Sequence, residues 1–260
     1  MNTYQEYKPV IQRQLKGHHV KLFAILLVLS LASSLASDAL IFVMNAQSVV
    51  YSICSVLLSL AFAFLNYVVL FLFIKRVREE RFTMEDVRYG FSKLLVLLVA
   101  GLLISILQML ISTVATLLVI VPPLYYIAMS ILSVLFVLWN AMVAFAIYDG
   151  YLGMGNIIKG SFALVKDHAA LLLRGGLLYV VWYVISQTAI LLVVHSFLGN
   201  TVANNMLEVF EHAMRAGSNA ILSIIGIYLL YYLVNFWLLV PLYTLAANVY
   251  ENHRLESFEQ

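Results

Sequence analysis

Charged residues are scarce in this sequence. Lysine and arginine contribute 15 residues and aspartate and glutamate 13, so that 11% of the 260 residues are charged and the net charge is +2. Soluble domains carry about 25% charged residues, whereas 63% of the residues here are hydrophobic. A chain of this composition cannot cover its surface with polar side chains, which excludes a soluble globular protein. A net charge this small gives no reason to expect a nucleic-acid partner.

Cysteine and the common catalytic motifs are also lacking. The single cysteine, Cys54, lies inside an apolar run and so cannot form an intramolecular disulfide or a CxxC metal site. The sequence contains no HExxH, GxSxG or Walker motif, and no paired carboxylates within an apolar run. His18 and His19 are adjacent, so they do not share a helix face, and we expect both to be solvated at the membrane surface. The sequence therefore predicts no catalytic residue, no cofactor and no metal site.

Long apolar runs dominate the sequence instead. Each of six runs exceeds the roughly 20 residues that a helix needs to cross a bilayer, and polar breaks such as Pro122-Pro123 separate them. The six runs cover residues 22–44, 48–74, 94–121, 124–148, 171–198 and 219–247. The predicted fold class is an all-α membrane protein, a single polytopic domain over residues 1–260 with six transmembrane helices.

The distribution of lysine and arginine predicts the orientation. The segment from Lys75 to Lys93 holds six of the fifteen basic residues. With six spans both termini lie on one side, and that side holds fourteen basic residues while the other holds only Arg215. Basic residues accumulate on the cytoplasmic side of a membrane. We therefore predict that both termini are cytoplasmic.

The first apolar run has a second interpretation. Residues 34–37, SLAS, have the form of a signal-peptide cleavage site. Cleavage there would leave five spans and a new N-terminus on the outside. Because the apolar run continues to Met44, we favour an uncleaved first span.

Short amphipathic segments precede the odd-numbered runs. Thr83 and Asp86 have the spacing of a capping box, and residues 84–91 and 156–165 carry apolar side chains at helical spacing. Such segments are typical of short helices that lie in the membrane interface, here on the cytoplasmic side.

A threefold internal repeat is one explanation of these segments. Gly17, Gly90 and Gly160 each precede an odd-numbered run, at separations of 73 and 70 residues. Each unit would be an interfacial helix followed by a helical hairpin. The alternative is that helices entering a membrane resemble one another, with glycine common at their ends.

Four segments carry a resemblance to a known family. They are QLKGHHVKLFAILL at 14–27, REERFTMEDVRYGF at 78–91, YDGYLGMGNIIKGSFALVKDH at 148–168 and VPLYTLAANVYE at 240–251. On these residues the chain resembles the YciC-like group of uncharacterised membrane proteins, which is related to the membrane domain fused to some glycerophosphodiester phosphodiesterases. The resemblance implies a six-helix protein of the bacterial cytoplasmic membrane. It implies no reaction, and phosphodiesterase activity is not carried over.

Every apolar run contains one strongly polar side chain. These residues are Asp38, Asn66, Gln108, Asn140, Gln187 and Asn235. An amide exposed to lipid is costly, so each should face the other helices. The amides could link helices, at about 0.6–2 kcal/mol per hydrogen bond, or they could line a polar cavity, and we favour linkage.

Two candidate sites follow from these polar side chains. Pro241 should kink the sixth helix and leave the Trp237 carbonyl without its helical donor, and two tyrosines lie near the middle of that helix. The candidate intramembrane polar site consists of Gln108, Asn140, Gln187, Tyr231, Tyr232 and Asn235. Asp38 and His195, near the same outer depth, form a candidate ionisable pair.

The sequence supports two classes of function. The first is a non-enzymatic membrane protein that handles a hydrophobic or amphiphilic partner, either a peptide, a lipid or another membrane protein. Its role would be transport, immunity to a membrane-active peptide, or an accessory one. The alternative is an integral membrane enzyme acting on lipid, which would need a cluster of ionisable residues at one depth. The oligomeric state stays open.

Overall fold

The computed structural model describes residues 3–44, 48–115, 122–151, 153–198 and 218–258, and this part of the chain contains helices and no strands. The helices are α1 (Tyr4–Leu15), α2 (His19–Val43), α3 (Val49–Val77), α4 (Met84–Ser92), α5 (Leu94–Ala115), α6 (Pro122–Tyr148), α7 (Met154–Asp167), α8 (Ala169–Gly175), α9 (Leu177–Leu198) and α11 (Ser218–Phe258). Within the described ranges five helices are long and apolar enough to cross a membrane, or six if α8 and α9 form one bent span. The chain is an all-α, multi-pass membrane protein.

The fifth predicted span is not one straight helix. Within residues 171–198 the chain bends by 59° between α8 and α9. The bend lies at Gly175-Gly176, and glycine is among the residues least favourable to a continuous helix. The same two glycines allow close packing, because a Cβ at Gly175 would overlap Leu245 and one at Gly176 would press on Val134.

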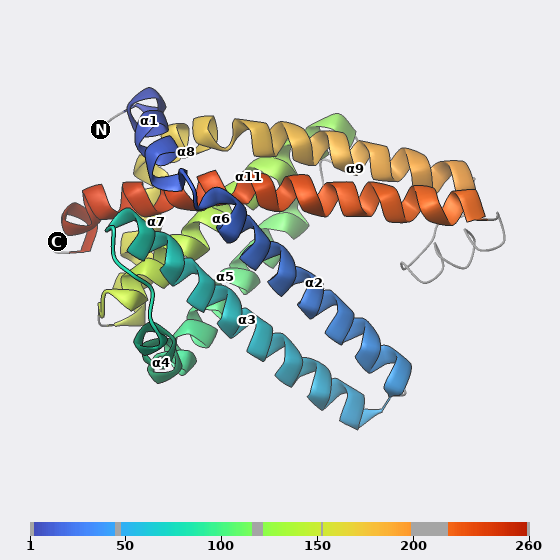
Figure 1. Ribbon diagram of the computed structural model, residues 1–260, viewed down its shortest axis with the longest axis horizontal. Coiled ribbons are helices and arrows are strands. Elements are labelled where there is room, and N and C mark those ends of the chain that lie inside the picture. Colours follow the sequence, from blue (N-terminus) through green and yellow to red (C-terminus); the bar gives the residue numbers. More distant parts are fainter. Residues whose placement is uncertain (1–2, 45–47, 116–121, 152, 199–217, 259–260) are drawn as a thin grey trace.

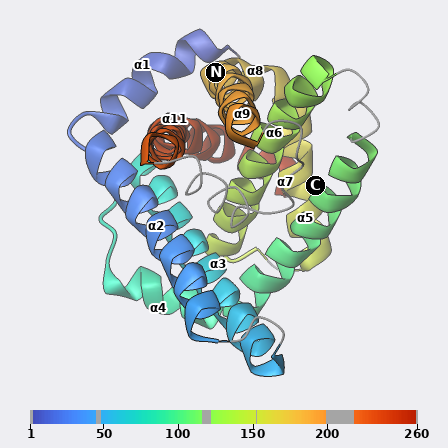
Figure 2. The ribbon, with the colours of Figure 1, turned by 90° about the vertical axis from the view of Figure 1, so that its right-hand side faces the viewer.

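The long helices form three pairs that diverge from one end of the molecule. Figure 1 shows α2–α3 and α9–α11 separating from the end that carries α1, α4, α7 and the C-terminus. Figure 2, which views the molecule from the right-hand side of Figure 1, shows the pair α5–α6 on the third side. We refer to the shared end as the basal end.

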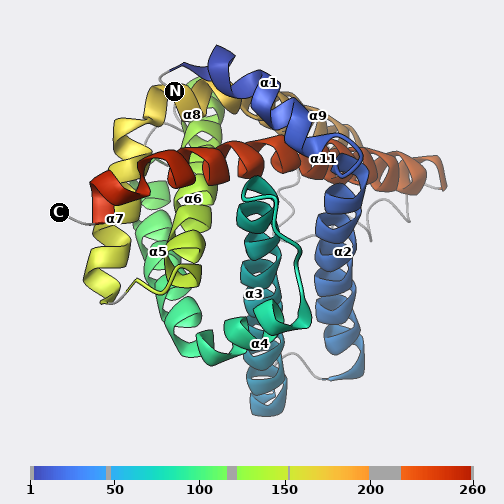
Figure 3. The same ribbon diagram turned by 60° about the vertical axis from the view of Figure 1, so that its left-hand side comes forward.

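Short helices gather at the basal end. Figure 3 shows α7 and α8 beside the C-terminal part of α11, with α1 crossing above it. Along the chain, α1 precedes α2–α3, α4 precedes α5–α6, and α7 precedes α8, α9 and α11. The segments predicted to be amphipathic helices at 84–91 and 156–165 are helical. A common origin of the three units stays a prediction.

Apolar side chains cover the outer faces of the long helices. Leu35 on α2, Leu110 on α5 and Leu178 on α9 are each at least 60% exposed. Transferring so much apolar surface into water would be strongly unfavourable, whereas hydrocarbon solvates it. The buried core lies toward the basal end, around residues 134–147 of α6 and 239–250 of α11. The diverging parts of the helix pairs are consequently lipid-facing.

Candidate functional site: a central cavity above a cluster of ion pairs

An ion-pair cluster joins the three helix pairs at the basal end. Arg78, just after α3, places Nη1 2.7 Å from Oδ1 and Nη2 2.8 Å from Oδ2 of Asp149, which follows α6. The same guanidinium donates to Glu251 of α11 at 2.7 Å from Nη2. Arg254 binds both carboxylates, and the Tyr250 hydroxyl donates to Asp149 at 3.0 Å. We call these five residues the basal cluster.

Ionisation within the basal cluster is set by charge pairing. Burial of Asp149 disfavours its carboxylate, but the hydrogen bonds and charge of Arg78, with hydrogen bonds from Tyr250 and Arg254, outweigh burial and lower the pKa of Asp149 below its ordinary value. Burial disfavours the charged form of Arg78 as well, yet Asp149 and Glu251 raise its pKa above the ordinary value. Both groups are therefore charged near neutral pH.

A second ionic contact fixes α4 against two long helices. Asp86 of α4 lies 2.8 Å from the Lys75 ammonium of α3 and accepts a hydrogen bond from the Tyr148 hydroxyl of α6 at 2.9 Å. Its Oδ2 also accepts the Thr83 backbone N–H at 2.6 Å, the contact predicted from the capping-box spacing. Burial opposes ionisation of Asp86, but the bonds from Lys75, Thr83 and Tyr148 lower its pKa.

The N-terminal helix is joined to α11 by a pair of amides. Gln14 of α1 donates to Asn248 Oδ1 at 3.2 Å and accepts from its Nδ2 at 2.7 Å. The Gln14 backbone carbonyl accepts from Arg76 Nε at 2.8 Å. Hydrogen bonds and ion pairs thus hold elements of all three pairs together at the basal end.

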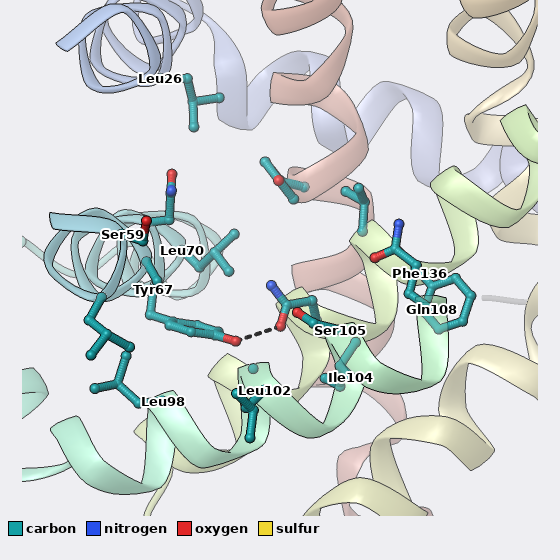
Figure 4. A pocket seen from close by; sticks show the side chains of 17 residues that line it. Leu26, Ser59, Tyr67, Leu70, Leu98, Leu102, Ile104, Ser105, Gln108 and Phe136 are labelled. Atoms are coloured by element: carbon teal, nitrogen blue, oxygen red, sulfur yellow. Dashed lines mark hydrogen bonds between the residues drawn. The ribbon is translucent and has the colours of Figure 1, made fainter. Parts of the chain in front are cut away.

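A cavity of about 500 Å³ lies among the helix pairs above this end. Its walls come from α2, α3, α5, α6 and α11 (Figure 4). The polar side chains that line it are Ser59, Asn66, Tyr67, Ser105, Gln108, Asn140 and Tyr243. The remaining lining residues are apolar or glycine, and none of them carries a formal charge. We call this space the central cavity.

Tyr67 spans the central cavity from α3 to α6. Its hydroxyl donates to Asn140 Oδ1 at 2.8 Å, and Figure 4 shows the ring directed past Leu102 and Ser105 of α5. A Cβ at Gly101 would overlap the Tyr67 hydroxyl, so glycine is needed for the close approach of α5. The link therefore joins two helix pairs at the depth of the cavity.

The amides of Asn66 and Gln108 also line the central cavity, and both side chains are exposed. Within the described ranges neither amide is hydrogen-bonded to another residue, and Asn140 is bonded only to Tyr67. Tyr67 of α3 lies eleven residues before Arg78, and Asn140 of α6 lies nine residues before Asp149. These separations correspond to about 13–17 Å along the helices. Three amides from three spans thus face one space well above the basal cluster.

The other candidate residues lie outside the central cavity. Asn235 of α11 is buried beside Tyr179 of α9, and its Oδ1 lacks a hydrogen-bond partner in the described part of the chain. Gln187 on α9 is half-buried, and Tyr231 packs edge-to-face on Tyr232 with ring centroids 5.5 Å apart. The structure brings Gln108 and Asn140 together and leaves Gln187, Tyr231, Tyr232 and Asn235 elsewhere.

The structure does not describe the predicted ionisable pair as a whole. Asp38 is exposed on α2, whereas the side chain of His195 lies outside the described residues. Their pairing stays a prediction.

His19 was expected to be solvated, but its side chain contacts Trp237 of α11. Its ring stacks on Trp237 with centroids 4.1 Å apart, and its Nε2 lies 3.2 Å from the Trp237 carbonyl oxygen. That carbonyl is the one that Pro241, inside α11, deprives of its helical donor. The sequence predicted the free carbonyl but not the group that satisfies it.

The central cavity can bind uncharged polar groups inside an apolar shell. Its amides and hydroxyls both donate and accept hydrogen bonds, and among the described residues no carboxylate or histidine lines it to transfer a proton. Sequence reasoning identified Asn66, Gln108 and Asn140 as intramembrane amides but missed Tyr67 and Tyr243. The available signal for Tyr67 was Gly101, an isolated glycine inside an apolar run that permits close approach of a neighbour.

Comparison with protein-family models, with curated proteins and with solved structures finds no match to this chain.

Proposed function

We propose that this protein binds the uncharged polar part of an amphiphilic molecule within the membrane, in the central cavity. The molecule would be a lipid or a hydrophobic peptide, and the role would be transport, immunity to a membrane-active peptide, or assistance to a partner membrane protein. Binding rather than catalysis is the function that the chemistry of the cavity supports best.

The observation that carries this proposal is the convergence of three intramembrane amides on one space. An amide in an apolar environment without a partner is costly, and the side chains of Asn66 and Gln108 are not hydrogen-bonded to other described residues. A bound molecule with hydroxyl or amide groups would satisfy them. The volume of about 500 Å³ falls in the usual range for small-molecule sites.

An integral membrane enzyme acting on lipid is less well supported. Within the described ranges the clustered carboxylates are already paired with basic residues: Asp149 and Glu251 with Arg78 and Arg254, and Asp86 with Lys75. Carboxylates held in such pairs are poor proton acceptors at neutral pH.

The wider assignment belongs to the same proposal. The chain would cross the bacterial cytoplasmic membrane six times, with α8 and α9 forming one bent span. Both termini and the basal end would then face the cytoplasm, where Lys75–Lys93 lies by the positive-inside rule. Membership of the YciC-like group and a threefold repeat are consistent with the order of the helices.

The experiment is recovery of the bound molecule. The wild-type chain is extracted from its native membrane without detergent, and its associated small molecules are identified by mass spectrometry against the bulk lipid. The test variant carries Ser59→Phe and Ser105→Phe, which place two rings in the central cavity from α3 and α5. We expect a molecule enriched on the wild type and lost from this variant.

The matched control is Ser52→Phe. Ser52 is an exposed serine on α3, two helical turns from Ser59, and it does not line the central cavity. This variant should retain the enriched molecule. Equal recovery from all three proteins, or only bulk lipid from the wild type, would refute the proposal.

A further inference from the structure

A second groove lies at the basal end, between α1, the turn into α2, and α11 at Pro241. Its volume is about 510 Å³. Lys8, Gln12 and Lys16 line it from the N-terminal segment and His19 from the start of α2. It is separate from the central cavity, since the two share no lining residue.

The polar side of the groove is cationic. Residues 8 and 12 are four apart on α1, so their side chains lie on the same face of that helix, and Lys16 follows the end of α1. Both lysines are exposed, and neither forms an ion pair with another described residue. No carboxylate lines the groove within the described ranges. Glu6, the acid nearest in sequence, accepts a hydrogen bond from Thr3 at 2.8 Å.

The other side of the groove is apolar. Ile11 and Leu15 are each about 5–6% exposed and contribute their side chains to the floor, while Pro241 closes one side. Two ammonium groups beside apolar side chains, in a groove at the end of the membrane spans, match a molecule with an anionic head and a hydrocarbon tail. A soluble anion would use only the cationic side of the groove and make no contact with its apolar lining.

We propose that this groove is a binding site for an anionic phospholipid, with the phosphate between Lys8 and Lys16 and an acyl chain passing along Pro241. Basic residues at the cytoplasmic surface attract anionic lipids by an amount that corresponds to about fivefold in affinity for each charge. The site is independent of the amphiphile proposed for the central cavity. It borders His19, which contacts the Trp237 carbonyl, and Pro241, so a lipid bound there would lie against α11 about one turn from that carbonyl.

Trp237 provides a reporter for this site. It stacks on His19 and is 44% exposed. The full chain carrying Trp139→Phe and Trp182→Phe is placed in phosphatidylcholine vesicles that contain the same fraction of either brominated phosphatidylglycerol or brominated phosphatidylcholine. We expect the brominated phosphatidylglycerol to quench Trp237 more strongly. In the same protein with Lys8→Gln and Lys16→Gln this preference should fall by about fivefold per charge.

The control neutralises two lysines elsewhere, Lys159→Gln and Lys166→Gln, which are exposed on α7. The control should keep the preference for phosphatidylglycerol. Equal quenching by both lipids, or an unchanged preference after neutralising Lys8 and Lys16, would overturn the proposal. Loss of the preference on adding inorganic phosphate at constant ionic strength would also overturn it, because a soluble anion would then be the ligand.

A second measurement avoids the tryptophan substitutions. Native mass spectrometry of the wild-type chain in neutral detergent counts bound phosphatidylglycerol and phosphatidylcholine added at equal concentration. We expect a phosphatidylglycerol adduct that the Lys8→Gln, Lys16→Gln protein lacks and the α7 control retains. Equal adducts of both lipids on the wild type would contradict the site.

Discussion

At the scale of single residues, Asp149 links all three helix pairs at the basal end. Its carboxylate binds Arg78 with both oxygens and is also bonded to Tyr250 and Arg254, while the side chain is only 8% exposed. Removing one member of a buried ion pair leaves the other charge uncompensated. The three helix pairs therefore depend on one carboxylate at their shared end.

Asp149→Asn should destabilise the folded protein by about 3 kcal/mol or more, because Arg78 and Arg254 would lose their common anion. Reversible unfolding in mixed micelles would measure the change in unfolding free energy. The control is Asp167→Asn at the exposed end of α7, which should change stability little. Similar losses for both variants would contradict the role of the basal cluster.

The stabilisation of the fold by Asp149 should be lost only as the pH becomes acidic. A carboxyl whose pKa is lower in the folded state stabilises the fold above its unfolded pKa of about 3.9. That contribution is lost as the pH falls through the folded pKa. The difference in unfolding free energy between wild type and Asp149→Asn should stay constant from pH 8 to about pH 5 and shrink below about pH 4. A difference that shrank near pH 6 would point to another group.

At the scale of elements, α11 continues as one helix through Pro241, and a residue far away in sequence contacts the carbonyl that this proline leaves free. Pro241 removes the helical donor from the Trp237 carbonyl, and His19 at the start of α2 supplies a replacement at 3.2 Å. Losing this hydrogen bond would cost about 0.5–1.5 kcal/mol. The contact thereby couples the first and last long helices.

His19→Ala should therefore destabilise the protein in the wild-type background and much less in a Pro241→Ala background. In the second background the N–H of residue 241 can satisfy the Trp237 carbonyl within α11. A double-mutant cycle of unfolding free energies should give a coupling of about 1 kcal/mol. Equal costs of His19→Ala in both backgrounds would show that the carbonyl contact is unimportant.

Helix boundaries were largely predictable because apolar length determines where a span can lie. The run at 22–44 corresponds to α2 (His19–Val43), and the capping-box spacing located the start of α4. The bend between α8 and α9 was not predictable, because hydropathy carries no information about the backbone at Gly175-Gly176. The extension of α11 to Phe258 was also missed. In the sequence Glu251 and Arg254 belong to a polar segment after the sixth apolar run, and only the fold shows that they pair with Arg78 and Asp149.

At the scale of the whole molecule, the divergence of the helix pairs decides which polar groups meet. Sequence reasoning placed six polar residues at membrane depth but could not tell which would face one another. Asn66, Gln108 and Asn140 share the central cavity, while Asn235 lies between α9 and α11. Crossing angles between pairs are set by packing over the whole basal end and leave no local pattern in any one helix.

The orientation can be tested by cysteine labelling in intact cells. In a background with Cys54→Ala, single cysteines replace Glu85 on α4, Asp167 on α7, and Glu208 between the last two apolar runs. If the basic side is cytoplasmic, as the positive-inside rule predicts, an impermeant maleimide should label position 208 and should label positions 85 and 167 only after the cells are opened. Labelling of position 85 in sealed cells would contradict the topology.

The most direct test of the central claim is an experimental structure of the wild-type chain in a patch of its native membrane. The account predicts non-protein density in the central cavity, in contact with the amides of Asn66, Gln108 and Asn140, and the link from Tyr67 to Asn140 intact. A closed, dry space filled by leucine and phenylalanine side chains, with these amides hydrogen-bonded to one another, would contradict it.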